Sequence, residues 1–129
     1  MKLLLDTAAF WWIATNSPRL SRRAVELFAD PANDLALSPV SIWELLVKHQ
    51  LGKLPSPSPI IELLTCAREA QLIRPLPLQE SAVLRLATLP PLHRDPFDRM
   101  LICQALDEGM TLLTPDEHIR AYPVPTLWE

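Results

Sequence analysis

One stretch near the N-terminus, LLLDTAAFWWIA (residues 3–14), decides the fold class. Its leucines belong to the short apolar run Lys2–Leu5, which is typical of a strand buried on both faces. The residues that follow, Thr7–Ala14, are typical of a helix, and the Ser17-Pro18 pair ends it. Asp6 is the only charged residue of the stretch and stands where the strand gives way to the helix. A strand followed directly by a helix predicts a βα unit.

Strand and helix patterns alternate along the rest of the chain. Ser38-Pro39 provides an N-cap and a first helical residue, and Asp95-Pro96 does the same before a helix that Gly109 ends. The predicted strands are residues 2–5, 35–37, 72–76, 110–113 and 124–127. The predicted helices are residues 7–14, 21–29, 39–50, 59–70, 80–89, 96–108 and 115–121. Pro75 and Pro77 restrict the third strand to an edge, because proline cannot donate a ladder hydrogen bond.

This alternation predicts an α/β fold with a central, mostly parallel sheet and helices on both faces. A chain of 129 residues has room for one hydrophobic core, so we expect a single domain over residues 1–129. Hydrophobic residues make up 49% and charged residues 21%, which excludes collagen-like and disordered proteins. With only two glycines, the chain has no phosphate-binding glycine loop. The net charge of −3 lacks the basic footprint usual in nucleic-acid-binding proteins.

The cysteines and the N-terminus indicate a cellular compartment. Cys66 and Cys103 lie in helical patterns and form neither a CxxC motif nor a zinc-binding spacing. We expect both to be small buried residues in a reducing environment. The apolar residues 10–14 are too short a run to span a membrane, and no signal-peptide cleavage pattern follows them. The sequence therefore predicts a cytoplasmic protein with no membrane partner.

Four acidic residues stand among apolar neighbours, whereas most of the 15 acids lie on polar faces. Asp6 ends the first strand, Glu44 lies within VSIWELLV, Asp98 begins DRMLICQA, and Asp116 follows TLLTP. An ionised carboxylate in apolar surroundings is costly unless it is paired or holds a metal. Each of the four, taken alone, is explained more simply as a helix cap, a turn residue or half of an ion pair.

The positions of the four acids along the predicted sheet bring them together. Asp6, Glu44 and Asp116 are expected at the edge formed by the carboxyl ends of the strands, and Asp98 at the start of a helix that reaches this edge. Four carboxylates in one pocket repel one another and require cations. Ligation by oxygen alone favours Mg²⁺ or Mn²⁺ over zinc. Two such ions about 4 Å apart would hold the attacking water and the leaving oxygen of a phosphodiester displacement.

Four blocks of sequence carry a family resemblance: LLLDTAAFWW (residues 3–12), LSPVSIWELLVKHQLGKL (37–54), HRDPFDRMLICQAL (93–106) and GMTLLTPDEHIRAY (109–122). In this order the blocks resemble the PIN-domain family, and within it the VapC-type toxins of bacterial toxin–antitoxin pairs. The resemblance implies a three-layer α/β/α fold and a Mg²⁺- or Mn²⁺-dependent endoribonuclease that hydrolyses RNA with a metal-activated water. It assigns the catalytic, metal-binding acids to Asp6, Glu44, Asp98 and Asp116. Asp95, one helical turn before Asp98, is the alternative third acid.

Other polar residues adjoin the four acids: Thr7, Ser38, Thr114, Arg94 and Arg99. The hydroxyl groups could orient a carboxylate or a water, although Ser38 is equally well explained as an N-cap and Thr114 as a turn residue. The two arginines could contact RNA phosphates or pair with the acids beside them. Lys48 lies four residues after Glu44 and is expected to pair with it.

Two other function classes fit parts of the pattern. A non-catalytic PIN-like module that binds nucleic acid or protein is disfavoured, because such a module would be free to lose one of the acids. A receiver-type phosphotransfer domain needs a lysine late in the chain, and none follows Lys53.

The first helices are rich in large apolar residues, and a small domain has limited interior in which to bury them. The residues concerned are Phe10, Trp11, Trp12, Ile13 and Phe28. We therefore expect a homodimer in which a cognate antitoxin covers a groove near these helices, as the family resemblance also implies.

Overall fold

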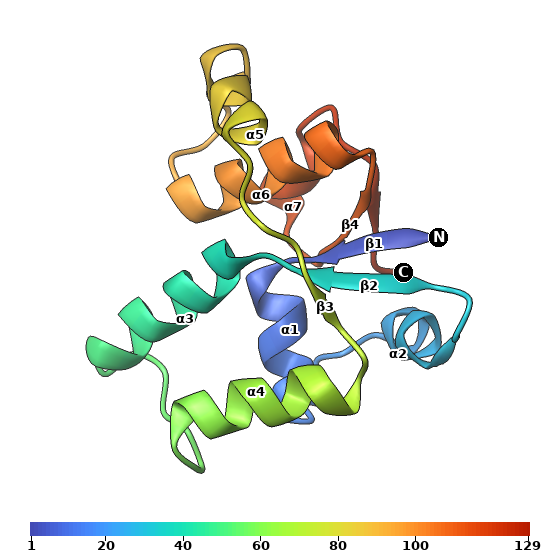
Figure 1. The fold of residues 1–129 in the computed structure, drawn as a ribbon, viewed down its shortest axis with the longest axis vertical. Helices are drawn as coiled ribbons and strands as arrows, with labels where there is room; N and C mark the ends of the chain where they lie inside the picture. Colours follow the sequence, from blue (N-terminus) through green and yellow to red (C-terminus); the bar gives the residue numbers. More distant parts are fainter.

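A five-stranded sheet forms the centre of the computed structural model, which describes residues 1–129 (Figure 1). The strands are β1 (Lys2–Leu5), β2 (Asp34–Leu37), β3 (Arg74–Pro75), β4 (Thr111–Leu113) and β5 (Thr126–Leu127). Their order in the sheet is β3-β2-β1-β4-β5, and every neighbouring pair is parallel. The first strand of the sequence is therefore the middle strand of the sheet, and its carboxyl end lies between those of β2 and β4.

Helices cover both faces of this sheet. Below it, in the view of Figure 1, lie α1 (Thr7–Ala14), α2 (Arg22–Ala29) and α4 (Ile60–Ala70). Above it lie α5 (Glu80–Leu84), α6 (Pro96–Glu108) and α7 (Glu117–Arg120). The remaining helix, α3 (Pro39–Gln50), contacts both α1 and α6. This arrangement confirms the predicted α/β/α layering.

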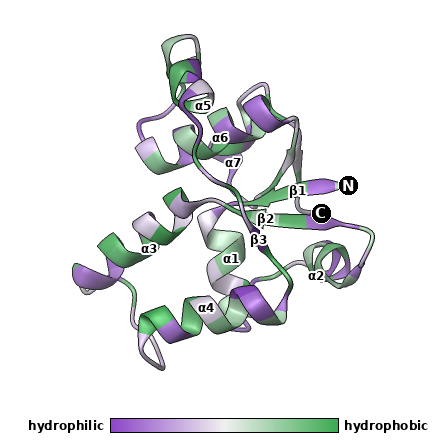
Figure 2. Ribbon diagram, viewed as in Figure 1, coloured by the Kyte–Doolittle hydropathy of each residue, from purple (hydrophilic) through white to green (hydrophobic).

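The alternation of side chains along β1 creates two hydrophobic cores. Leu3 and Leu5 belong to the core beneath the sheet, and Leu4 belongs to the core above it. All three side chains are fully buried, and burial of a leucine stabilises a fold by about 1.5–3 kcal/mol. Figure 2 shows β1 and β2 largely as hydrophobic ribbon, with hydrophilic stretches at their outer ends and along parts of the helices and loops. The position of β1, and with it that of the residue that follows, is thus determined by packing from both sides.

The strands and helices are those predicted; several keep the predicted bounds, β2 begins one residue earlier, and the others are shorter. The third strand has two residues instead of five, because Leu72 adopts a left-handed conformation with φ 54° where α4 ends. The backbone hydrogen bonds here are typical of a helix terminus: Leu72 N donates to Glu69 O, and Ile73 N donates to Arg68 O. The predicted helix at residues 80–89 is α5 followed by a 3₁₀ turn, Arg85–Ala87.

Two expectations about exposure were wrong. Phe10 is fully buried beneath the sheet, whereas Trp11, Trp12 and Ile13 are half-buried, because α1 turns one face toward β1. Cys103 is buried as expected, but Cys66 is exposed on α4. None of the helices combines the length and the apolar composition needed to cross a bilayer.

Candidate active site

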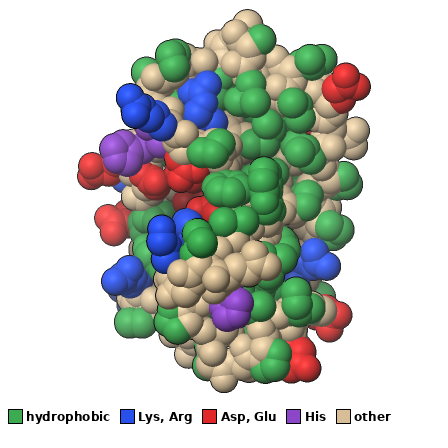
Figure 3. Space-filling model, turned by 90° about the vertical axis from the view of Figure 1, so that its left-hand side faces the viewer, with side chains coloured by type: hydrophobic (Ala, Val, Ile, Leu, Met, Phe, Trp, Pro, Cys, Tyr) green, Lys and Arg blue, Asp and Glu red, His purple; other side chains and the backbone are tan.

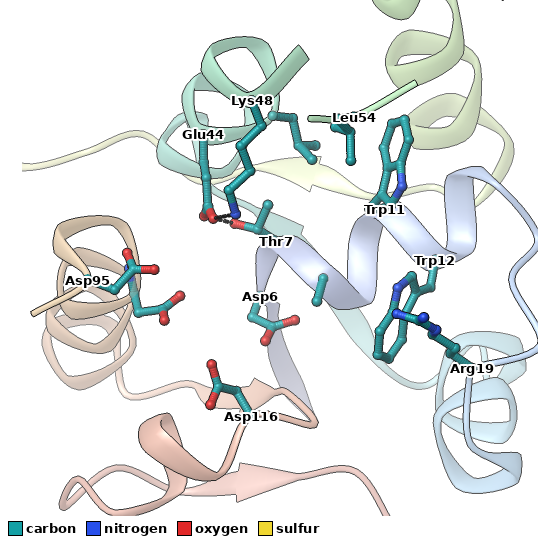
Figure 4. Close-up of a pocket in the computed structure, with 13 residues that line it drawn as sticks. Asp6, Thr7, Trp11, Trp12, Arg19, Glu44, Lys48, Leu54, Asp95 and Asp116 are labelled. Atoms are coloured by element: carbon teal, nitrogen blue, oxygen red, sulfur yellow. Dashed lines mark hydrogen bonds and ion pairs between the residues drawn. The ribbon is translucent and has the colours of Figure 1, made fainter. Parts of the chain in front are cut away.

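Five carboxylates line one cleft at the carboxyl ends of β1 and β4 (Figure 4). The cleft has a volume of about 310 Å³. The structure brings together all four acids singled out in the sequence and the alternative third acid: Asp6, Glu44, Asp98, Asp116 and Asp95. They come from separate parts of the chain, because the strand ends, the start of α6 and the first turns of α3 meet at this edge of the sheet.

Asp6 is buried, with 3% of its surface exposed. It is the N-cap of α1, and its Oδ1 accepts a hydrogen bond of 2.7 Å from Ala9 N. Its Oδ2 accepts a hydrogen bond of 2.5 Å from the Thr114 hydroxyl. Burial raises the pKa of Asp6 from 3.8 to about 7, and the charges of Asp98 and Asp116 add to this, although the two hydrogen bonds oppose it.

Thr114 links two of the acids. It follows β4 and is completely buried. While its hydroxyl donates to Asp6, the same oxygen accepts a hydrogen bond of 3.0 Å from Asp116 N. Asp116 in turn is the N-cap of α7, where its Oδ1 accepts from His118 N at 2.8 Å. Thr114 therefore acts both as a turn residue and as an orienting group, the two roles that the sequence left open.

Glu44 enters the cleft from α3 and is 3% exposed. The Thr7 hydroxyl donates to its Oε1 at 2.7 Å, and Lys48, one helical turn later, forms an ion pair with its Oε2. This confirms the expected pairing of Lys48 with Glu44 and places Thr7 in contact with a site acid. Partial burial lowers the pKa of Lys48, but the hydrogen bond and charge of Glu44 outweigh it and raise the pKa overall, so the lysine stays charged.

Asp95 and Asp98, the two candidates for the third acid, have different hydrogen-bond partners at the start of α6. Asp95 is the N-cap, and its Oδ1 accepts hydrogen bonds from Phe97 N and Asp98 N. The Asp98 carboxylate caps nothing, and its Oδ2 lies 3.3 Å from Nε2 of His93. Burial and the charge of Asp95 raise the pKa of Asp98 from 3.8 to about 7, although the hydrogen bond with His93 lowers it. Asp95 thus caps α6 through Oδ1, whereas neither oxygen of Asp98 accepts a hydrogen bond from the backbone.

The donor set suits a hard divalent cation. Carboxylate oxygens are the ligands that Mg²⁺ and Mn²⁺ prefer, and neither the buried Asp6 nor the partly buried Asp98 pairs with a lysine or arginine. No three side chains of the Asp, Glu, His or Cys type approach one another closely enough to bind a single ion by themselves. Mg²⁺ usually keeps several waters and takes only one or two carboxylates from the protein, so the wider spacing fits it.

Three residues considered in the sequence lie elsewhere. Ser38 is buried and caps α3, where its Oγ accepts from Val40 N at 3.0 Å. Arg94 does not line the cleft, and Arg99 is turned toward Pro90 O and the Tyr122 hydroxyl. None of the three contacts the cleft directly.

The cleft has an aromatic and basic end that the sequence did not indicate. Trp11, Trp12 and Arg19 line it beside the carboxylates, with the Arg19 guanidinium 5.8 Å from the centre of the Trp12 ring. Trp11 lies four residues after Thr7, so helical spacing could have indicated that it shares the cleft face of α1. No spacing signal indicated Arg19, which comes from the loop after α1.

Comparison with known proteins identifies the family. The PIN domain family model matches residues 3–125, so the chain belongs to the PIN-domain family. The chain is 28% identical over 131 residues to a protein named Ribonuclease VapC22 from Mycobacterium tuberculosis, and the match covers 98% of each protein. This confirms the resemblance noted in the sequence.

Solved structures confirm the fold. A chain in the crystal structure of VapBC2 from Rickettsia felis bound to a DNA fragment matches the whole chain over its own whole length, with a TM-score of 0.72 and 19% identity. A chain in the structure of VapBC-1 from nontypeable Haemophilus influenzae matches with a TM-score of 0.63 and 18% identity, over 98% of this chain and 97% of its own length.

We predict that Asp6→Asn stabilises the metal-free protein at alkaline pH. Because the pKa of Asp6 is raised in the folded state, the folded protein binds protons more tightly than the unfolded chain between about pH 4 and pH 7. The free energy of unfolding therefore falls as the pH rises through this window. Asparagine removes the buried charge and keeps an oxygen for Ala9 N, so urea denaturation in EDTA at pH 8 should show a gain of at most about 4 kcal/mol.

The gain should shrink toward pH 4, where Asp6 is protonated in both states. Asp34→Asn is the matched control, because the hydrogen bond and charge of Arg74 lower the pKa of this exposed acid. That variant should gain no stability at pH 8. A gain for Asp6→Asn that does not vary with pH would contradict the effect of burial on its pKa.

Proposed function

We propose that this protein is a metal-dependent endoribonuclease and the toxin of a toxin–antitoxin pair. The observation that carries the proposal is the cleft of five carboxylates, in which neither Asp6 nor Asp98 pairs with a lysine or arginine and burial raises the pKa of each to about 7. A buried cluster of acids costs folding free energy and is explained when a cation and an anionic substrate meet there. The name of the relative from Mycobacterium tuberculosis, a ribonuclease, supports the same activity.

Asp6, Glu44, Asp98 and Asp116 would hold Mg²⁺ or Mn²⁺ through their oxygens. When bound, such an ion supplies a Lewis acid that activates water and neutralises charge on a phosphodiester. The overall reaction forms a bond between the water oxygen and phosphorus and breaks the bond from phosphorus to the leaving ribose oxygen.

The contribution of the chain is to hold the acids in place before the reaction. Ala9 N and Thr114 fix both oxygens of Asp6, Thr7 fixes one oxygen of Glu44, and His118 N fixes one oxygen of Asp116. Preorganised charges need no rearrangement when the transition state forms, which is the usual source of electrostatic catalysis. Lys48 pairs with Glu44 and adds a positive charge to a cleft that must accept a polyanion.

The aromatic and basic end of the cleft suits single-stranded RNA. Trp11 and Trp12 offer rings on which an unpaired base stacks, and such stacking contributes about 1–3 kcal/mol per base. Arg19, exposed above Trp12, is placed to contact a phosphate or stack on a base. An RNA strand running from this end would bring a phosphodiester to the carboxylates.

Apolar surface remains exposed for the proposed protein partners, a cognate antitoxin and a second copy of the chain. Figure 3 shows a broad hydrophobic strip beside the recess that holds the acids. A groove between α1 and α2, lined by Ile13, Leu20, Val25 and Phe28, lies where the sequence predicted an antitoxin segment. Trp43 on α3 is 60% exposed, and tryptophan is enriched at the centres of protein interfaces. We propose the cytoplasm as the compartment, since the exposed thiol of Cys66 is unpaired.

RNA cleavage should require Mg²⁺ or Mn²⁺ and stop in EDTA. Asp98→Asn should lower kcat more than about 100-fold, because a lost metal ligand removes several kcal/mol of transition-state stabilisation. Asp95→Asn is the matched control, since asparagine is an equally good N-cap and the variant should retain most of its activity. Cleavage that persists in EDTA would contradict the metal mechanism, and an active Asp98→Asn with an inactive Asp95→Asn would move the third acid to Asp95.

Arg19→Gln should weaken RNA binding. The measurement is fluorescence anisotropy of a labelled single-stranded RNA in an Asp98→Asn background, which prevents cleavage. Loss of one phosphate contact should reduce the slope of log Kd against log salt concentration by about 0.7. Arg23→Gln is the control, because Arg23 lies on α2 beside Glu129, away from the cleft. Equal effects of the two substitutions would contradict a role for the aromatic end in binding RNA.

The chain should be a homodimer at micromolar concentration, and Trp43→Ser should convert it to a monomer. Light scattering measures both. Leu72→Ser is the control, because Leu72 is 87% exposed at the end of α4 and its loss should leave the dimer intact. A monomeric wild-type chain would contradict the dimer, and a dimeric Trp43→Ser would exclude α3 from its interface.

A further inference from the structure

A group of side chains that takes no part in the cleft lies directly behind Asp98. His93, in the loop before α6, has its Nε2 3.3 Å from Asp98 Oδ2 and its Nδ1 2.9 Å from the Tyr122 hydroxyl. The backbone N of His93 also donates to this hydroxyl, at 3.1 Å. Arg99 donates to the same hydroxyl at 3.0 Å and to Pro90 O at 2.9 Å. His93, Tyr122, Arg99 and Asp98 thus form a single hydrogen-bonded chain that ends on a carboxylate of the site, although Tyr122 is distant from the other three in the sequence.

The donors around Tyr122 determine the tautomer of His93. A phenol oxygen has two lone pairs and one hydrogen. His93 N and Arg99 Nη1 are both obligate donors, so they occupy the two lone pairs. The phenol hydrogen is then left to point at Nδ1 of His93, which must accept it. A proton on Nδ1 would aim a third donor at an oxygen that has no lone pair left.

An imidazole that accepts at Nδ1 carries its hydrogen on Nε2. Nε2 therefore donates to Oδ2 of Asp98, and the contact between the two side chains is a directed hydrogen bond. This hydrogen bond occupies Oδ2 of the carboxylate. The other oxygen, Oδ1, accepts from no group of the chain and stays available to the cleft. We infer that His93 is a positioning residue, which holds the Asp98 carboxylate in the orientation that binds the metal ion and is itself held in the donating tautomer by Tyr122 and Arg99.

The surroundings keep this arrangement rigid. Tyr122 is 3% exposed, and the side chains of His93 and Asp98 are each 13% exposed. The His93 ring stacks on His118, with ring centres 5.8 Å apart and planes inclined by 11°, and packs edge-on against Tyr122. Rotation of the imidazole would break these contacts together with two hydrogen bonds. The metal ion as the ligand of Asp98 rests on the proposed function, whereas the tautomer of His93 follows from the geometry alone.

The tautomer can be observed without metal or RNA. Long-range ¹H–¹⁵N correlation spectra of the ¹⁵N-labelled full-length chain at pH 8, in EDTA, distinguish a protonated from an unprotonated imidazole nitrogen. His93 should show a protonated Nε2 and an unprotonated Nδ1. In Tyr122→Phe, which lacks the hydroxyl, this single tautomer should give way to a mixture. A protonated Nδ1 in the wild-type protein would overturn the inference.

The positioning role is tested by metal affinity in two variants of His93. In His93→Gln the side-chain amide reaches the place of Nε2 and can still donate to Asp98, whereas in His93→Asn it reaches only the place of Nδ1. The dissociation constant of Mn²⁺, measured from the free-ion signal in electron paramagnetic resonance, should rise about 10-fold or more in the asparagine variant and less than about 3-fold in the glutamine variant. A purely structural role would lower the thermal midpoint of both variants alike and leave their Mn²⁺ affinities equal.

The outcomes separate this inference from the proposed function. Wild-type protein that binds no Mn²⁺ would overturn the proposed metal enzyme, and with it this role of His93. Wild-type protein and His93→Asn that bind Mn²⁺ equally, while Asp98→Asn binds weakly, would overturn the role of His93 alone. Loss of affinity in His93→Asn with recovery in His93→Gln would support it.

Discussion

The rest of the structure depends on one buried carboxylate, that of Asp6. Packing on both faces places β1 in the middle of the sheet, so the residue at its carboxyl end is removed from solvent whatever its type. Burial of an acid is tolerated only where donors replace its lost water. Ala9 N on α1 and the Thr114 hydroxyl after β4 provide them, and Asp6 thereby connects three elements. The interaction that closes this edge of the fold is therefore the same one that creates the site.

The helices around the cleft stabilise most of its carboxylates. Asp6, Asp95 and Asp116 are the N-caps of α1, α6 and α7, so their carboxylates meet the positive ends of helix dipoles and free backbone N–H groups. Glu44 receives Lys48 instead. These local partners let five acids share one cleft in a stable fold, yet they leave Asp6 and Asp98 with raised pKa values. The uncompensated part of the charge is what a divalent cation would neutralise.

Local signals in the sequence predicted the elements and the acids. Ser38-Pro39 and Gly109 define helix ends through backbone chemistry that needs no distant contact, and each of the four acids stood out against apolar neighbours. Features set by tertiary packing were not predictable in this way. The burial of Phe10 depends on which side of α1 meets the sheet, and Leu72 ends α4 in a left-handed conformation that its residue type disfavours. The contact of His93 with Tyr122 was not predictable for the same reason, since the two residues lie 29 positions apart.

Asp95 and Asp98 are held in the cleft in different ways, and this difference supports Asp98 as the proposed third acid. A metal ligand must be oriented before the ion arrives, and a backbone N–H orients Asp6, Asp95 and Asp116 because each begins a helix. Asp98 lies inside the first turn, where the backbone N–H groups point to Asp95, so its carboxylate needs a donor from a side chain. His93 is that donor, and Tyr122 leaves it no other tautomer. Asp95 thus orders the helix that carries Asp98, while Asp98 keeps an oxygen directed at the cleft, and the two adjacent acids need not compete for one role.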